Sequence, residues 1–157
     1  MELSIVKGNI ENLGDCTEAL LNSEIGKVYF SSKTRARAFL NEGLRKGEIF
    51  VAMGENDQCV GYIWFTLKGA FYKFPYVLNI AIKKDFRRRG IGKKLLKFFE
   101  EKGFENSSKL FLLVSSFNIE AKKWYQEMGY KEVGLIPDLL KEGIPEYIMM
   151  KSKETMR

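Results

Sequence analysis

The sequence predicts an α/β fold with a mixed, mostly antiparallel central sheet flanked by about four helices. The first observation is that short runs rich in β-branched and aromatic residues alternate with amphipathic segments of helical period. The second is the order of these segments, roughly β-α-α-β-β-β-α-β-α-β-β, which combines hairpins with helical crossovers. A length of 157 residues suits one domain, residues 1–157.

The first half of the chain is expected to supply two helices and three strands. Ser31 or Ser32 can cap the second helix, and Gly47 can end it. A turn at Gly54–Asp57 joins two apolar runs into a hairpin. The expected elements are a strand at Leu3–Lys7, helices at Ile10–Leu21 and Thr34–Arg45, and strands at Glu48–Met53 and Gln58–Leu67.

The second half carries clear helix-end signals. Asn118 is a preferred N-cap residue, and Gly129 is a natural residue for the position after a helix. The expected elements are a strand at Pro75–Ile82, a helix that follows Arg87–Gly92 and runs to about Lys102, a strand at Lys109–Ser115, a helix between Asn118 and Gly129, and strands at Tyr130–Leu135 and Glu146–Lys151.

The composition excludes several kinds of chemistry. The chain has no histidine, which excludes Ser-His-Asp and Cys-His catalysis and any histidine metal site. Its two cysteines, Cys16 and Cys59, are too few for a structural zinc site. They are expected to be buried thiols, and a single disulfide stays open. No metal is expected.

The charge and the hydropathy pattern limit the choice of partners. With 26 Lys and Arg against 20 Asp and Glu, the formal net charge is +6, which favours an anionic partner such as nucleic acid or a phosphate-bearing cofactor. The longest apolar stretches fall short of the about 18 residues that a membrane helix needs. Because no targeting segment is recognised either, the expected location is the cytoplasm.

The most informative segment is the basic stretch 83–97, in which eight Lys or Arg accompany one acidic residue. A predicted strand leads into the turn Arg87-Arg88-Arg89-Gly90-Ile91-Gly92, which opens a helix. Amides at a helix start lack intrahelical partners and carry positive dipole charge, so they bind anions. The segment does not match a Walker A loop, because Arg87 replaces its first glycine. Leu95 replaces the third glycine of a dinucleotide fingerprint.

The second informative segment is Asn118–Tyr130. Ala121, Trp124, Tyr125 and Met128 share one helix face. Taken alone, Asn118 is explained as a cap and Tyr125 as a core residue.

Together the two segments resemble the GNAT superfamily of N-acetyltransferases. The motif Q/R-x-x-G-x-G/A is matched by Arg87, Gly90 and Gly92, and the motif N-x-x-A-x-x-x-Y-x-x-x-G-F/Y by Asn118, Ala121, Tyr125, Gly129 and Tyr130. The element order agrees over nearly the whole chain. Asn79–Ile82 and Glu146–Met150 look most like the ribosomal-protein alanine N-acetyltransferase branch.

The resemblance implies a site for acetyl-CoA. The diphosphate would lie on the motif loop, and the pantetheine arm would pair with the preceding strand and reach Asn118. The residues implied are Ile80, Ala81, Ile82, Arg87, Arg88, Arg89, Gly90, Ile91, Gly92, Lys93 and Asn118. Tyr125 matches the family's general acid, which protonates the departing thiolate. A backbone N–H of the Ile80–Ile82 strand would stabilise the oxyanion.

The general base is the point at which the match fails. The alanine N-acetyltransferase branch carries a glutamate where this chain has Leu113. Either a carboxylate near the C-terminus acts through water, with Asp138, Glu142 and Glu146 as candidates, or the acceptor amine needs little help. An α-amine, with a pKa of about 7.7–8.0, is far more often neutral at pH 7 than lysine, with a pKa of about 10.4.

The predicted function is therefore transfer of acetyl from acetyl-CoA to a primary amine, on a small molecule or a protein N-terminus. Two alternatives stay open. One is a family member that binds CoA without catalysis, and the other is a basic RNA-binding or ribosome-associated module. The second alternative has no recognisable RNA motif, so nucleic acid is not the expected partner. A monomer and a homodimer are both compatible with the sequence.

Overall fold

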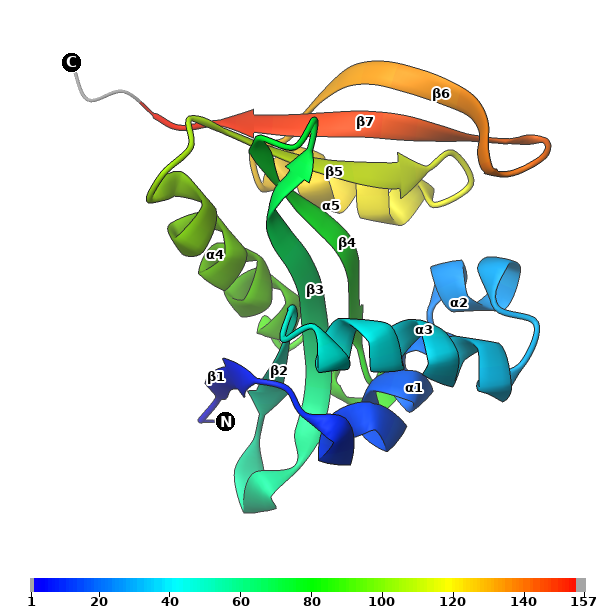
Figure 1. Cartoon of the computed structure of the whole chain (residues 1–157), viewed down its shortest axis with the longest axis vertical. Coiled ribbons are helices and arrows are strands. Elements are labelled where there is room, and N and C mark those ends of the chain that lie inside the picture. Colours follow the sequence, from blue (N-terminus) through cyan, green and yellow to red (C-terminus); the bar gives the residue numbers. More distant parts are fainter. Residues whose placement is uncertain (1, 155–157) are drawn as a thin grey trace. The chain divides into compact units, whose positions relative to one another are not determined.

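Figure 1 shows the computed structural model of the chain, which describes residues 2–154. Seven strands form a sheet in the hydrogen-bonded order β1-β2-β3-β4-β5-β7-β6. The strands are β1 (Ser4–Lys7), β2 (Ile49–Met53), β3 (Cys59–Ala70), β4 (Phe74–Ile82), β5 (Lys109–Ser115), β6 (Lys131–Lys141) and β7 (Ile144–Ser152). The helices are α1 (Leu13–Leu21), α2 (Glu24–Tyr29), α3 (Lys33–Arg45), α4 (Ile91–Phe104) and α5 (Ile119–Glu127). The mixed α/β class is confirmed.

The structure differs from the predicted elements in several places. Strand β3 continues to Ala70, beyond the predicted end at Leu67, and the predicted helix at Ile10–Leu21 is a 3-10 helix (Ile10–Asn12) followed by α1. The structure also contains α2, a helix of six residues that the sequence pattern did not predict, which makes five α-helices within residues 2–154. Ser23 caps it by accepting a hydrogen bond from the amide of Gly26, and a Cβ at Gly26 would lie 1.8 Å from the carbonyl oxygen of Leu20. Gly26 thus lets the start of α2 lie close against the end of α1. In addition, β6 and β7 extend beyond the predicted strands because they continue to the turn that joins them.

The described chain divides into two compact units. Unit 1 comprises residues 2–65 and 79–99. In it, β1, β2 and β3 pair antiparallel, with Ser4 opposite Met53 and Ile49 opposite Trp64. Helices α1 and α3 pack side by side (Figure 1). Gly43 lets α3 approach the strands, because a Cβ there would lie 2.7 Å from both Ile49 and the ring of Trp64.

Unit 2 comprises residues 66–78 and 100–154. Strand β5 pairs antiparallel with β7 over Lys109–Ser115, and Tyr76 and Val77 of β4 pair with β5 in parallel. Tyr130 is fully buried and donates a hydrogen bond of 2.9 Å to Glu100. Burial, reinforced by the neighbouring Glu100 carboxylate, raises the pKa of Tyr130 well above its ordinary value, so its phenol stays protonated.

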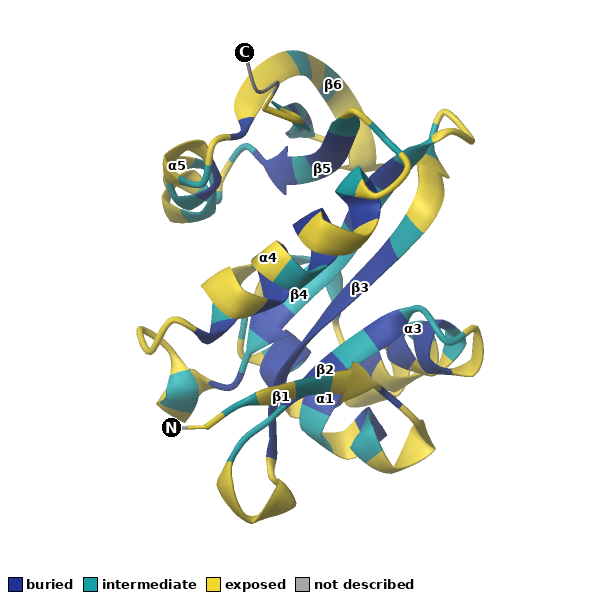
Figure 2. Ribbon diagram, turned by 90° about the vertical axis from the view of Figure 1, so that its left-hand side faces the viewer, coloured by how far each residue is buried: buried dark blue, intermediate teal, exposed yellow. Residues whose placement is uncertain are grey.

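Burial follows the pattern of a packed core. Strand β3 is buried over Cys59–Phe65 and exposed toward its far end (Figure 2). Cys16 and Cys59 are buried free thiols, as the sequence led us to expect. Among residues 2–154, no helix has the length and apolar character that a membrane span requires.

Candidate functional site

The start of α4 has the geometry of an anion-binding helix end. Gly90 has φ of +80°, and the first α-helical hydrogen bond runs from the amide of Lys94 to the carbonyl of Gly90. The amides of Ile91, Gly92 and Lys93 therefore precede the first intrahelical donor. A Cβ added at Gly90 would meet no atom within 4 Å, so the backbone is open on this side. Amides and open space together suit a phosphate group.

The basic side chains of this loop differ in what they contact. Arg88 and Arg89 are exposed, and Arg89 lies over the ring of Phe86 at 5.3 Å. Arg88 adopts a left-handed backbone with φ of 63°, which is unusual for a residue other than glycine. Arg87 instead uses its guanidinium within the protein, donating to the carbonyl of Asn22 at 2.8 Å and to that of Ile82 at 3.2 Å. These two hydrogen bonds connect Arg87 to β4 and to the end of α1, so Arg87 helps to fix the shape of the loop.

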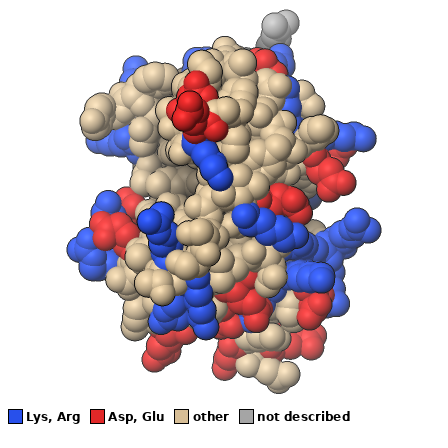
Figure 3. Space-filling model, turned by 90° about the vertical axis from the view of Figure 1, so that its right-hand side faces the viewer, with Lys and Arg blue, Asp and Glu red and all other residues tan. Residues whose placement is uncertain are grey.

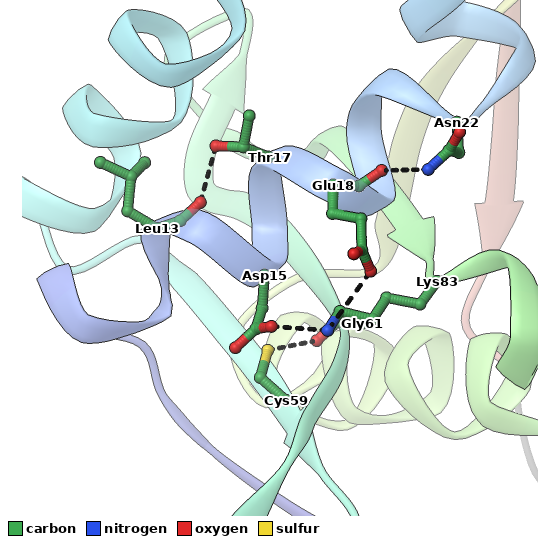
Figure 4. Close-up of polar contacts among 8 residues, drawn as sticks. All are labelled: Leu13, Asp15, Thr17, Glu18, Asn22, Cys59, Gly61 and Lys83. Atoms are coloured by element: carbon green, nitrogen blue, oxygen red, sulfur yellow. Dashed lines mark hydrogen bonds and ion pairs between the residues drawn. The ribbon is translucent and has the colours of Figure 1, made fainter. Parts of the chain in front are cut away.

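Lys83, which directly follows β4, is held between two acidic residues of α1 (Figure 4). Its Nζ lies 2.5 Å from Oδ1 of Asp15 and 3.3 Å from Oε2 of Glu18, and its side chain is only 10% exposed. Burial alone would lower the pKa of Lys83, but the attraction of Asp15 and Glu18 outweighs it and the pKa lies above its ordinary value. The charge of Lys83 is therefore compensated inside the protein.

The C-terminal part of β4 is fixed from the β3 side. The hydroxyl of Tyr62, which is fully buried, donates to Oδ1 of Asn79. A Cβ at Gly61 would lie 2.9 Å from the carbonyl oxygen of Ala81, so the two backbones approach closely here. Ala81 is buried, whereas Ile80 and Ile82 are half-buried. This places a rigid strand end immediately before the basic loop.

In unit 2, the second motif forms α5. Asn118 caps the helix, because its side-chain oxygen accepts a hydrogen bond of 3.4 Å from the amide of Ala121. Tyr125 is 7% exposed, and its ring contacts those of Trp124 and Tyr130 at 5.0 and 5.9 Å. Burial raises the pKa of Tyr125 well above its ordinary value. Its phenol is therefore protonated at physiological pH and can act as a proton donor.

A comparison with models of protein families shows to which family the chain belongs. The model described as the acetyltransferase (GNAT) family matches residues 17–130, which is more than half of the chain. The chain belongs to the GNAT acetyltransferase family. The matched stretch includes both the basic loop before α4 and the whole of α5.

Individual relatives agree with this membership. An uncharacterised N-acetyltransferase of Methanocaldococcus jannaschii is 34% identical over 100 residues, which cover 62% of either chain, so the match spans somewhat less than two thirds of that relative's length. An N-alpha-acetyltransferase of Sulfurisphaera tokodaii is 29% identical over 123 residues, 71% of this chain and 74% of the relative.

Solved structures share the fold. Ard1 from Thermoplasma volcanium superposes with a TM-score of 0.80 at 18% identity, covering 99% of this chain and 100% of its own. A ribosomal-protein-alanine N-acetyltransferase from Escherichia coli gives a TM-score of 0.72 at 15% identity, with 99% and 97% covered. At identities this low, the superpositions establish a common fold and no more.

The GNAT motifs leave the general base open, and the structure describes the three acidic candidates. Asp138 is exposed and accepts a hydrogen bond of 2.6 Å from the amide of Gly143. Glu142 is exposed. Glu146 is 2% exposed and accepts a hydrogen bond from the hydroxyl of Ser115, whose Oγ lies 2.7 and 2.8 Å from its two oxygens. Each of the two bonded carboxylates thus has a structural role.

The sequence does not reveal that two residues of this GNAT chain, Lys83 and Ser115, bind carboxylates within the protein. The sequence alone shows Lys83 as one of the basic residues of the stretch 83–97, and nothing in it distinguishes Ser115. The spacing of Asp15 and Glu18, three residues apart on α1, places two carboxylates on one helix face. That spacing was the available signal for a buried cation, but it did not identify which lysine would be bound.

Proposed function

We propose that this GNAT chain is an acetyl-CoA-dependent N-acetyltransferase that acts on a primary amine by direct attack. The observation that carries the proposal is the start of α4, where unbonded first-turn amides and an open glycine backbone follow a basic loop. Diphosphate groups are bound by this combination of amides, dipole and cations. The family membership supports the donor, because GNAT enzymes generally use acetyl-CoA.

The residues present fit this donor. The amides of Ile91, Gly92 and Lys93 would hold its diphosphate, with Arg88, Arg89 and Gly90 beside them, and Ile80, Ala81 and Ile82 would pair with its pantetheine arm. The side-chain oxygen of Asn118 is used by the helix cap, so its amide NH₂ would donate to the same arm. Acetyl-CoA supplies the thioester that the amine attacks.

The chain's own groups would then act on the developing charges. A backbone N–H of the Ile80–Ile82 strand donates to the thioester oxygen, an interaction that is worth about 3 kcal/mol in comparable sites. Tyr125 would donate its phenolic proton to the departing sulfur, and the proton that the attacking nitrogen loses would pass to solvent, from which the phenolate regains one. Burial raises the pKa of Tyr125, which keeps the phenol protonated before the reaction and also makes it a weaker acid than an exposed tyrosine.

The acceptor that suits the site is an α-amino group. Leu113 supplies no base, Asp138 and Glu146 are bonded within the protein, and Glu142 is exposed in the turn between β6 and β7. An amine with a pKa of about 8 supplies its own neutral form at pH 7 in more than a hundredfold greater fraction than lysine does. The names of two archaeal relatives, both N-alpha-acetyltransferases, support the same class.

Calorimetry and mass spectrometry test the proposal. We expect acetyl-CoA to bind at micromolar concentration, a single-stranded RNA not to bind at physiological salt, and a peptide to gain one acetyl group at its N-terminal amine. Binding of RNA without acetyl-CoA would favour the basic module instead. On the face of the molecule that Figure 3 shows, Lys and Arg lie interspersed with Asp and Glu.

The pH dependence of the rate tests the absence of a protein base. With a peptide acceptor at subsaturating concentration, the rate should rise with pH and level off above the pKa of the peptide's own α-amine. Replacing the peptide by one with a more acidic α-amine should move the inflection by the same amount. An inflection that stays fixed when the acceptor changes would show that a group of the protein takes the proton.

A further inference from the structure

Lys83 occupies the junction between β4 and the basic loop and is tied to both the sheet and α1. Its amide donates to the carbonyl of Val60 at 2.9 Å, and its carbonyl accepts from the amide of Phe86 at 2.9 Å. Its Nζ reaches Asp15 and Glu18 on α1 (Figure 4). The backbone and the side chain of one residue therefore fix where the chain leaves the strand.

A second attachment lies a few residues further along the loop. Arg87 donates through its guanidinium to the carbonyl of Asn22, the residue at the C-terminal end of α1, and to that of Ile82. The loop is thus joined to α1 at both Lys83 and Arg87. The segment between these attachments and α4 contains two left-handed residues, Arg88 and Gly90, so its shape depends on being held.

We propose that Lys83 is a positioning residue, which with Asp15 and Glu18 holds the loop in the shape that binds the donor's diphosphate. This inference rests on the proposed function, because it assumes that the loop binds acetyl-CoA. Lys83 does not act as one more cation for the donor, because its side chain is almost buried and two carboxylates compensate its charge. Its effect is preorganisation, which removes part of the ordering cost of binding.

The neighbouring residue Lys84 provides a matched control. Lys84 is exposed and carries the same charge one position further along the chain. We expect Lys83→Met to weaken acetyl-CoA binding about tenfold, the size typical of residues that act through others. The turnover number at saturating donor and the KM for the acceptor should be unchanged. Lys84→Met should change donor binding by less than about twofold, because exposed charges are screened by salt.

Variants of the partners and a conservative variant complete the design. Lys83→Arg should restore most of the donor affinity, since it keeps a cation between the two carboxylates. Asp15→Asn, at a side chain that is 41% exposed, should weaken donor binding in the same direction, and it keeps the test decisive if Lys83→Met does not fold. The double variant Asp15→Asn, Lys83→Met should lose less binding free energy than the sum of the two single losses, because both substitutions remove the same interaction.

The outcomes separate this inference from the function on which it rests. If the wild type does not bind acetyl-CoA, the proposed function fails and this inference fails with it. If the wild type binds but Lys83→Met and Lys84→Met weaken binding equally, Lys83 is only part of the basic field. If Lys83→Met lowers thermal stability and leaves donor affinity intact, the role of Lys83 is structural, and the inference is wrong.

Discussion

Gly90 offers the sharpest stability test of the loop before α4. Its φ of +80° is one that L-residues adopt at a cost of about 1–2 kcal/mol. Because a Cβ there would meet no atom within 4 Å, Gly90→Ala introduces no collision and isolates this backbone cost. The loss is partly offset because alanine has fewer unfolded conformations, so we expect a net loss of about 1 kcal/mol.

Gly14 is a matched control for Gly90. It lies in α1, where a Cβ would also meet no atom within 4 Å, but there the backbone is helical. Gly14→Ala should therefore stabilise the protein by about 0.5 kcal/mol. In a chain of this length, a change of 1 kcal/mol shifts the melting temperature by about 2–4 °C.

Thermal unfolding followed by circular dichroism measures both variants against the wild type. The two melting temperatures should move in opposite directions, down for Gly90→Ala and up for Gly14→Ala. If Gly90→Ala melts at or above the wild-type temperature, the left-handed backbone at residue 90 is wrong, and the geometry assigned to the start of α4 is wrong with it.

Three further predictions concern Tyr125, the buried tyrosines and the cysteines. Tyr125→Phe should lower the turnover number by about a hundredfold or more, as expected for loss of a general acid, and an unchanged value in steady-state kinetics excludes that role. Burial raises the pKa of Tyr76 to about 12, helped by the charge of Glu146, and raises that of Tyr130 further. Since the folded pKa values exceed the unfolded value of about 10, stability should be full below pH 10 and fall above it, by up to about 1.4 kcal/mol per tyrosine and pH unit. Urea unfolding between pH 8 and 11 checks this, and a flat profile contradicts it. Cys16 and Cys59, at 0% and 2% exposure, should react with a thiol reagent only as the chain unfolds, and rapid labelling of the native protein contradicts their burial.

Local signals in the sequence predicted most of the elements that carry the candidate site. Strand β5 was predicted at its observed bounds, the cap at Asn118 forms as expected, and Gly129 has the positive φ of a helix stop. These features depend on interactions within a few residues, so a single sequence reports them well.

What could not be predicted depends on contacts between distant parts of the chain. Helix α2, which has six residues, is an exception, because it is simply too short to show a periodic pattern. The ion pair of Lys83 with Asp15 joins residues 68 positions apart, and that of Lys151 with Glu100 joins β7 to α4. A charge in a sequence does not reveal whether it faces solvent, a ligand or a partner in the core.

The proposed function is tested most directly by the release of CoA thiol. The purified chain would be incubated with acetyl-CoA and a panel of peptides that differ in their first residue, with N-terminally blocked peptides of the same sequences as controls. We predict release well above the rate of hydrolysis for at least one free α-amine and none for its blocked counterpart. If the folded protein binds acetyl-CoA but releases no thiol with any peptide or small primary amine, the chain is a CoA-binding protein, and the proposed catalysis is refuted.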